Sequence, residues 1–440
     1  MPRFARCSAL AVVIAVSKIS SGADIPAQLS LSEALKIALS NSTVIREAMA
    51  QLEQTSGQYK QARSALFPQL DLFARQSIQT INLQGIGLDL PGLVEPGLIG
   101  PFGSMDARLL LNQDIFNLAT VRAWKSYRSR QDASRILITD AREIVTLNVV
   151  STYLQALRAK ATRDTLVQQI GLANELYKIT RERVTQGVSA ELDANRAMQK
   201  VNTLEQQWQQ ASQSYIAAKL ALANILQARI TSDFEVADDA AYGTGATADR
   251  DASIRTALAT RADYRAAQAE VRAAELNVQS VKATRLPTLG MFFNDGQSGI
   301  SPARNVNTYR LQGAITMSIF NGGRIRGEIE EAEGALNQAR TVVDRNRLQI
   351  ETDVLTAISA LEWALKEVDT STRNVKLSRQ EVDFTRSRFS QGIADNTEVV
   401  NAQDRLTQAD DANIRALYSL GLARANLARA IGAAETTYRK

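Results

Sequence analysis

The distribution of proline is the feature of this sequence that most restricts its fold. Of the 8 prolines, two lie near the N-terminus and six fall in two short windows, 68–101 and 287–302. The stretches 103–286 and 303–440 contain none. Because proline removes a helix N–H donor and clashes with the preceding turn, these two stretches are free to form unusually long helices.

Apolar residues in the proline-free stretches alternate at spacings of four and three, which predicts coiled-coil seams rich in small residues. A helix over about 119–186 would be on the order of 100 Å long at 1.5 Å per residue. Gly187 and Gly392 are expected to end the two long helices with a left-handed cap, so that each long helix folds back into a hairpin. The clearest seam residues are Ile350, Val354, Ala357, Leu361, Ala364 and Val368, then Ala197, Val201, Leu204 and Trp208, then Ala402, Leu406 and Ala409.

The proline windows show period-two alternation instead, which predicts strands with one apolar and one polar face. Such strands suit a membrane barrel, although a half-buried sheet of a soluble protein gives the same alternation. The glycine-rich stretch 84–103 is not followed by the GK[ST] sequence of a phosphate-binding loop, and we interpret it as an exposed loop between strands. The strands are expected at about 68–80, 105–116, 287–295 and 307–320.

The chain also contains a tandem duplication of a helix-strand-strand-helix-helix unit. Residues 38–48 match 257–267, and residues 179–197 match 384–402. The matched order of proline and glycine positions excludes a generic likeness between alanine-rich helices. The predicted organisation is a first repeat over 31–230, a linker or insert over 231–250, a second repeat over 251–433 and a C-terminal tail over 434–440.

Residues 1–23 are typical of a secretory signal, with Arg3 and Arg6 before a short apolar run and small residues before the expected cleavage site. Cys7 is the only cysteine of the sequence and lies inside this signal, so lipidation through cysteine is not expected. No later segment is apolar for long enough to predict a transmembrane helix.

The composition argues against several classes of function. The sequence has no histidine, and without cysteine in the mature chain the usual ligands of metal and haem cofactors are missing. The formal net charge of +5 falls to about +2 without the three basic residues of the signal, which gives no case for a nucleic-acid partner. We therefore expect no catalysis, no cofactor and no bound metal.

Four motifs in their order resemble the TolC-like outer-membrane efflux protein family, also called outer-membrane factors. They are LFPQL at 66–70, RLPTL at 285–289, IFNGG at 319–323, and the QG pairs at 186–187 and 391–392. The resemblance implies a mainly α chain with a small membrane β part. Four strands per chain would complete a 12-stranded barrel in a homotrimer, and the helices would form a periplasmic α-barrel. It also implies a girdle around the helices, supplied by residues 231–250 and the C-terminal end.

The function implied by this resemblance is an outer-membrane channel-tunnel with a large periplasmic portion, serving tripartite efflux or type I secretion. Its implied partners are outer-membrane lipid, a periplasmic adaptor (membrane fusion protein) and an inner-membrane pump of the RND or ABC type. A periplasmic coiled-coil adaptor or scaffold without a pore is the alternative. That alternative explains the hairpins but leaves the two strand pairs unexplained. A passive pore without an adaptor is a third reading.

The resemblance places adaptor docking and the channel entrance at the hairpin turns Gln186, Gly187, Gln391 and Gly392. Asp193 and Glu398 follow the turn glycines by six residues, where the family often has an acidic residue. Residue 401 is Asn, where some members have a second acidic residue, so a weaker negative ring is expected. The other reading of Asp193 and Glu398 is a helix N-terminal carboxylate that stabilises the helix dipole.

Two further groups of residues carry expectations. Asn321, Gly322 and Gly323 form the predicted turn between a strand and the following long helix. Four arginines lie just before the hairpin turns, and we interpret them as a solvated helix face, with adaptor or inter-subunit contacts as the second reading. These are Arg181, Arg183, Arg386 and Arg388.

Overall fold

The computed structural model describes residues 24–83, 85, 87, 98–231, 233–237, 249–301 and 303–439. The expected signal over 1–23, with Cys7, lies outside the described residues, as does the larger part of the insert over 231–250. The final residue of the expected C-terminal tail, Lys440, is also outside them.

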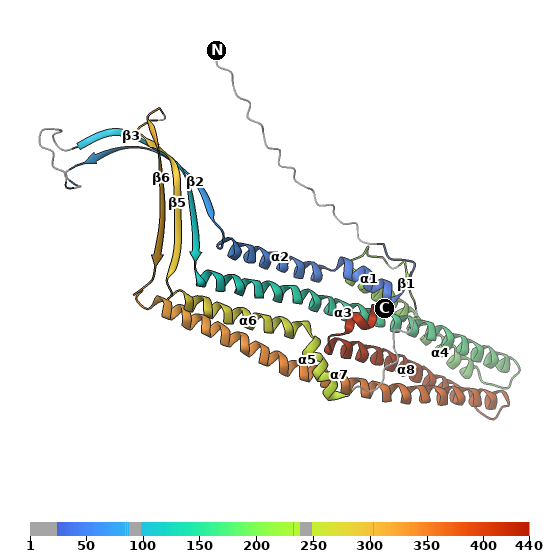
Figure 1. The fold of residues 1–440 in the computed structure, drawn as a ribbon. Coiled ribbons are helices and arrows are strands. Elements are labelled where there is room, and N and C mark those ends of the chain that lie inside the picture. The colour runs from blue at the N-terminus through green and yellow to red at the C-terminus, as the bar shows by residue number, and fades with distance from the viewer. Residues whose placement is uncertain are drawn as a thin grey trace, which may run out of the picture.

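The elements alternate between helices and strands along an elongated molecule, with the sheet at one end and two helical hairpins at the other (Figure 1). The first half contains β1 Gln28–Leu29, α1 Leu31–Asn41, α2 Thr43–Ser64, β2 Gln69–Asn82, β3 Leu98–Phe116, α3 Leu118–Thr185 and α4 Glu191–Ile225. The second half contains β4 Glu235–Val236, α5 Arg250–Thr260, α6 Ala262–Ala283, β5 Thr288–Gly299, β6 Asn305–Thr316, α7 Arg324–Ser390, α8 Asn396–Ala430 and α9 Ala434–Tyr438.

The two longest helices, α3 with 68 residues and α7 with 67, fill the proline-free stretches. At 1.5 Å per residue each is about 100 Å long. The predicted seams are buried for the most part; in α7, for example, Val354 and Leu361 are buried. Trp208 of the predicted α4 seam is an exception at 38% exposed, because the buried face of α4 passes from Leu204 to Ala211. Within the described residues, no helix carries an apolar stretch long enough to cross a bilayer.

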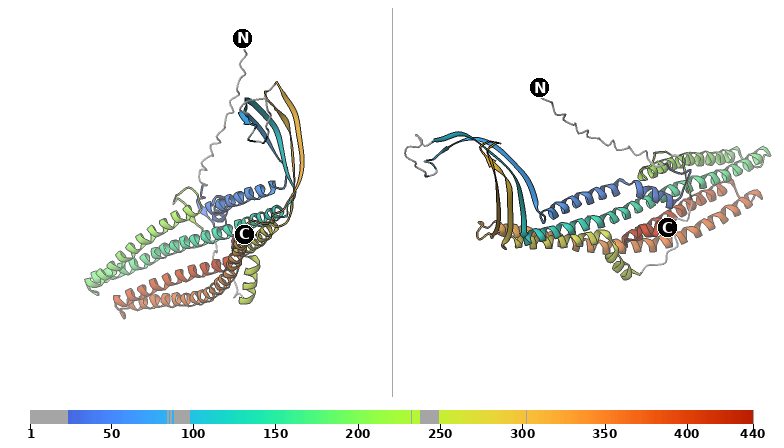
Figure 2. Two further views of the ribbon diagram at one scale, coloured as in Figure 1. Left: turned by 90° about the vertical axis from the view of Figure 1, so that its left-hand side faces the viewer. Right: turned by 45° about the horizontal axis from the view of Figure 1, so that its top comes forward.

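The helices lie side by side in one curved layer (Figures 1 and 2). In the half near the hairpin turns the order across the layer is α4, α3, α8, α7, and in the half near the sheet it is α2, α3, α6, α7. The two flanks of the layer are therefore different. Helices α2 and α4 form one flank, and α7 forms the other, with α5 packed against it near the middle of its length.

The four long strands form one antiparallel sheet in the order β2-β3-β5-β6. Its register brings apolar side chains into rows on one face: Leu70 lies opposite Leu111, Leu111 opposite Phe293, and Phe293 opposite Leu311. No described residue of the chain covers this face, since Leu311 is 66% and Ile315 76% exposed. The other face carries polar and charged residues, including Asp71, Arg108 and Arg310.

The strand lengths differ from those expected from alternation. β3 begins at Leu98 instead of 105, so residues 98–103 of the expected glycine-rich loop belong to a strand. The prediction was wrong there because Gly100, Pro101 and Gly103 interrupt the alternation, whereas pairing with β2 continues to Leu98. β5 continues to Gly299 and β6 ends at Thr316, four residues before the expected end.

The helix expected before each strand pair is broken into two. α1 ends where Ser42 takes an extended conformation and caps α2. α5 ends at Arg261, which has a similar backbone conformation but makes no side-chain cap to α6. The resulting bend sets α1 and α5 at an angle to α2 and α6, so that α1 packs against α3 and α5 against α7 (Figure 1). Amphipathic periodicity continues through both breaks, which is why the sequence did not reveal them.

A small two-stranded sheet, β1 paired in parallel with β4, lies between the half near the large sheet and the half near the hairpin turns. We call this level of the molecule the waist. The small sheet joins the start of the described chain to the part of the insert around Glu235. The largest hydrophobic core forms here, where α1, α3, α4 and this sheet meet. Its largest fully buried side chains are Leu29, Leu35, Tyr153, Leu154, Tyr215, Leu222 and Leu226.

Candidate functional site

The two hairpin turns have the same backbone geometry. Gln186 and Gln391 are the last right-handed residues of their helices, and Gly187 and Gly392 follow with φ of 78° and 77°. A residue with a Cβ rarely adopts this φ, so glycine is required at both positions. The turns lie side by side at the end of the molecule farthest from the sheet (Figure 1).

Each turn is closed by the pair of hydrogen bonds known as a Schellman motif. In the first turn the Val188 N–H donates to the Arg183 carbonyl at 2.9 Å, and the Gly187 N–H donates to the Val184 carbonyl at 3.0 Å. The second turn has the same two bonds at positions 205 residues later. The Ile393 N–H donates to the Arg388 carbonyl at 2.9 Å, and the Gly392 N–H donates to the Phe389 carbonyl at 3.0 Å.

The two predicted entrance carboxylates lie in the first turns of α4 and α8, and each has a basic neighbour. Glu398 is 3.5 Å from Arg388 in the same hairpin, and both side chains are about half exposed. Asp193 is 3.9 Å from Arg196, one helical turn further on. Both carboxylates also sit where a helix N-terminus favours negative charge, so the structure is compatible with either reading of them.

Asn401 lies on the exposed side of α8, in a groove of about 450 Å³ between α7 and α8. The groove also contains Glu398, so two of the three predicted entrance residues share it, while Asp193 is in the other hairpin. The remaining lining residues are Leu377, Gln380, Glu381, Phe384, Thr385, Arg388 and Arg405.

Several side chains connect the hairpins to each other, among them Arg183 and Asn396 close to the turns. Others include Arg386, which binds Glu175 of α3 at 2.5 Å. Arg183 Nη1 donates to the Phe389 carbonyl at 2.5 Å, and the guanidinium lies 4.8 Å from the centre of the Phe389 ring. The solvated-face interpretation was therefore wrong for Arg183. Asn396 is only 2% exposed and donates from Nδ2 to the Asp193 carbonyl at 2.8 Å. Thr180 Oγ1 lies 3.5 Å from Asn396 Oδ1.

The predicted strand-to-helix turn lies at the opposite end of α7. Gly322 and Gly323 have φ of 61° and 88°, and the Asn321 side chain accepts from the Ile325 N–H at 3.4 Å. In the first half, Asn117 holds the corresponding place and caps α3 by accepting from the Thr120 N–H at 3.2 Å. This turn aligns β6 with α7 and has no reactive group.

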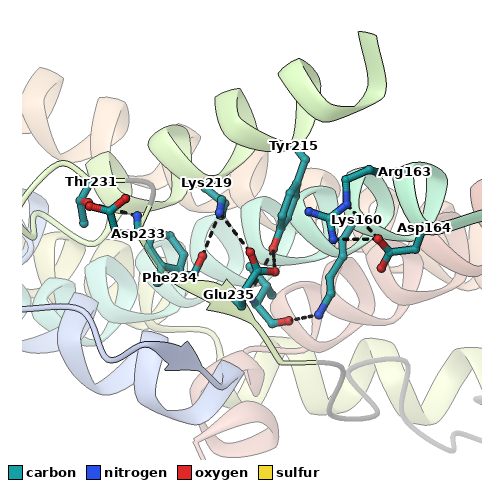
Figure 3. Close-up of polar contacts among 10 residues, drawn as sticks. Lys160, Arg163, Asp164, Tyr215, Lys219, Thr231, Asp233, Phe234 and Glu235 are labelled. Atoms are coloured by element: carbon teal, nitrogen blue, oxygen red, sulfur yellow. Dashed lines mark hydrogen bonds and ion pairs between the residues drawn. The ribbon is translucent and has the colours of Figure 1, made fainter. Parts of the chain in front are cut away.

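A cluster of polar and charged side chains surrounds Glu235 at the waist (Figure 3). The Tyr215 hydroxyl donates to Glu235 at 2.8 Å, and Lys219 lies 3.3 Å from the same carboxylate. Lys160 donates to the Val236 carbonyl at 2.7 Å. Burial, together with the Glu235 carboxylate, raises the pKa of Tyr215 to about 12. These hydrogen bonds and ion pairs from Tyr215, Lys219 and Lys160 hold β4 against α3 and α4. We therefore interpret the cluster as a support of the fold.

The family model for the outer membrane efflux protein matches residues 34–227 and 253–433 of this chain. Among curated proteins, the pyoverdine export outer membrane protein OpmQ of Pseudomonas putida is 26% identical over 91% of this chain and 85% of its own length. The toluene efflux pump outer membrane protein TtgC of Pseudomonas putida is 24% identical over 91% and 82%.

Solved structures show the same fold. The outer membrane protein VceC of Vibrio cholerae has a TM-score of 0.78 at 18% identity, covering 91% of this chain and 96% of that one. The CmeC outer membrane channel of Campylobacter jejuni has a TM-score of 0.76 at 19% identity, covering 92% and 86%. The mainly helical fold with few strands and the outer-membrane location are thereby confirmed, and the chain belongs to the outer membrane efflux protein family.

Proposed function

We propose that this chain forms, as a homotrimer, the outer-membrane exit duct of a tripartite efflux or type I secretion system. The observation that carries the proposal is the open four-stranded sheet. Among the described residues β2 pairs only with β3, and β6 pairs only with β5. Unpaired strand edges are not tolerated in lipid, so the exposed apolar face requires further strands from other copies.

Three copies would supply a 12-stranded barrel, in which β6 of one subunit meets β2 of the next. The strands β2, β3, β5 and β6 alternate in direction, so β6 and a neighbouring β2 would be antiparallel, as the other pairs are. The order helix, strand, strand, long helix, helix occurs in both halves of the chain, which supports an origin by tandem duplication.

In this proposal the substrate passes through the duct without chemical change. An inner-membrane pump of the RND or ABC type would deliver the substrate, and a periplasmic adaptor would join the pump to the hairpin turns at Gly187 and Gly392. The long hairpins support this arrangement, since they project about 50 Å beyond the waist at 1.5 Å per residue.

The experiment that tests the function uses the full chain extracted from outer membranes in detergent. A mass of three chains and discrete conductance steps in planar bilayers are expected, together with recovery of an adaptor and a pump after cross-linking in cells. Recovery of the protein in the soluble periplasmic fraction would instead support the adaptor or scaffold alternative. A conducting trimer that never cross-links to an adaptor would support a passive pore.

We further propose that Asp193 and Glu398 attract cations at the entrance. Replacing both by Ala should weaken block of the channel by divalent cations severalfold, because each trimer would lose six carboxylates next to the turns. Single-channel recordings with Mg²⁺ on the hairpin side measure this effect. Glu381→Ala provides a control in the same groove, since that carboxylate is already bound by two nitrogens of Arg405. Unchanged conductance and block in the double variant would rule out a role at the entrance.

A further inference from the structure

A polar groove runs along α3 in the half of the molecule near the hairpin turns. Helix α3 forms its floor, and α4 and α8 form its two walls. The groove consists of two hollows, of about 360 and 260 Å³, which are continuous because they share four lining residues. The shared residues are Thr162, Ala211, Ser214 and Asp411.

The groove lies on the side of α3 opposite to the waist sheet of β1 and β4. On the sheet side, Tyr153 and Lys160 donate to main-chain carbonyls of β1 and β4, at 2.9 and 2.7 Å. The groove residues Gln155 and Thr162 each follow one of them by two positions, which is about 200° around a helix of 3.6 residues per turn. Three copies of the waist sheet inside a ring would obstruct the proposed duct. The sheet therefore belongs outside the ring, and the groove faces the duct.

Side-chain amides and hydroxyls dominate the groove, and its charge is balanced, since Arg158 and Asp411 line it with one charge of each sign. Gln169 at the floor is only 6% exposed and donates from Nε2 to Asp410 at 3.1 Å, while its Oε1 accepts no hydrogen bond from the described part of the chain. Each amide offers both donors and an acceptor, as a peptide group does. The amides are those of Gln155, Gln169, Gln207, Gln210 and Gln408.

The shape of the groove suits a chain better than a compact molecule, because compact ligands are usually enclosed on most sides. From Gln155 to Gln169 the groove extends about 21 Å along α3 at 1.5 Å per residue. An extended peptide rises about 3.3 Å per residue, so about six of its residues would fit. The groove follows the direction of the long helices, which is also the direction of transport through the proposed duct.

We propose that this groove binds an extended, uncharged peptide segment of the substrate as it moves through the duct. The amides and hydroxyls of the walls exchange hydrogen bonds with the peptide groups, and the balanced charge disfavours strongly charged segments. The proposal rests on the proposed function and adds the chemical class of substrate that the duct wall recognises. A periplasmic adaptor fits the groove less well, since it would approach the helices from outside the ring.

Single-channel recording with a synthetic peptide on the hairpin side tests the groove. The probe has about seven residues of alternating serine and asparagine, matched to the groove length and blocked at both ends. The unaltered channel should show interruptions of current. Gln207→Leu combined with Gln210→Leu should shorten them about fivefold or more, because hydrogen bonds to the peptide are lost. The matched control is Gln206→Leu combined with Gln209→Leu, which removes two exposed amides of the same helix that do not line the groove.

A second measurement locates the peptide in the purified trimer in detergent, using the fact that the described part of the chain contains no cysteine. Benzophenone attached to Ser214→Cys should capture a fluorescent form of the probe on illumination. Benzophenone attached to Gln209→Cys, on the same helix but outside the groove, should not.

The outcomes separate this proposal from the proposed function. Shorter interruptions in the groove variant alone, with capture at 214 and not at 209, would support peptide binding. A conducting channel that the peptide does not interrupt, or equal interruptions in the two double variants, would overturn the groove and leave the duct intact. Capture of an adaptor at 214 in cells would also overturn it. A protein without conductance steps would overturn the duct itself, on which the role of the groove depends.

Discussion

At the scale of single residues, two glycines in neighbouring strands differ sharply in what surrounds them. A Cβ added to Gly296 in β5 would lie 2.2 Å from the Ala107 carbonyl oxygen and 2.3 Å from Arg108 Cβ. A Cβ added to Gly313 in β6 would meet nothing within 4 Å. Gly296 therefore lets β3 and β5 approach where the Arg108 side chain crosses the sheet toward Asn294.

We predict that Gly296→Ala reduces the yield of folded protein strongly, whereas Gly313→Ala leaves it nearly unchanged. The backbone must shift to accept the first methyl group, and overpacking of this kind costs roughly 1–3 kcal/mol or more. The measurement is the fraction of chain that resists unfolding in detergent at room temperature, compared between the two variants. Equal yields would show that the approach of β3 to β5 is not needed for assembly.

Two arginines at matched positions of the two halves also behave differently. Arg183 and Arg388 each precede a turn glycine by four residues. Arg183 crosses to the Phe389 carbonyl of the other hairpin, whereas Arg388 stays beside Glu398 in its own. Local sequence is nearly the same at both places. The difference depends on which hairpin lies alongside, and a single sequence does not contain that information.

At the scale of elements, local patterns predicted the helices better than the strands. The seams around Val354 and Leu204 depend on spacing within one helix, so α3, α4, α7 and α8 could be predicted together with the turns at Gly187 and Gly392. The start of β3 at Leu98 depends on hydrogen bonds to β2, and those bonds overcome the poor strand propensity of glycine and proline.

The short C-terminal helix α9 is held to α3 by two carboxylates. Glu143, buried in α3, accepts from the Ala434 N–H at 2.7 Å and from the Glu435 N–H at 3.2 Å. Glu435 in turn binds Arg142 through both carboxylate oxygens, at 2.8 and 2.5 Å. Burial raises the pKa of Glu143 above its ordinary value of 4.5. The hydrogen bond from Arg142 lowers the pKa of Glu435 below the same value.

We predict that α9 is bound most firmly near pH 4.5. The stabilisation from Glu435 is present above 4.5 and is lost as the pH falls through its lowered pKa. For Glu143 the folded state binds the proton more tightly, so its contribution is lost as the pH rises from 4.5 through its raised pKa. Glu143→Gln stays neutral, so it should remove the weakening of α9 binding above pH 4.5. Glu435→Gln should likewise remove the weakening of α9 binding below pH 4.5.

Fluorescence anisotropy of a dye attached to Thr436→Cys, recorded between about pH 3 and pH 7, measures how firmly α9 is held. Thr436 is exposed, and its hydroxyl donates to the Ala433 carbonyl rather than to α3. The same dye at Thr397→Cys in the second hairpin gives the baseline for general unfolding. If the anisotropy of the unaltered protein does not change with pH, the roles given to Glu143 and Glu435 in holding α9 are wrong.

At the scale of the whole molecule, the two hairpins pack side by side through α3 and α8, from the waist to the turns. Near their tips the described contacts between them include the Arg183 bond to Phe389 and the Asn396 bond to Asp193. The proposed duct would widen at its entrance if the hairpins of each subunit moved apart. Because these contacts lie at the ends of long helices, breaking them would favour separation of the tips while the packing of α3 on α8 nearer the waist remains.

We predict that Arg183→Ala and Asn396→Ala increase the open fraction of single channels. Loss of one such contact removes about 1–2 kcal/mol from the closed arrangement, a factor of roughly 5 to 30 in population. Arg181→Ala is the matched control: Arg181 lies two residues away, and its 2.5 Å bond to Glu191 stays within the first hairpin. If all three variants conduct alike while thermal unfolding shows intact trimers, separation of the hairpins does not open the duct. If only the cross-hairpin variants gain conductance, Arg183 and Asn396 hold the entrance closed.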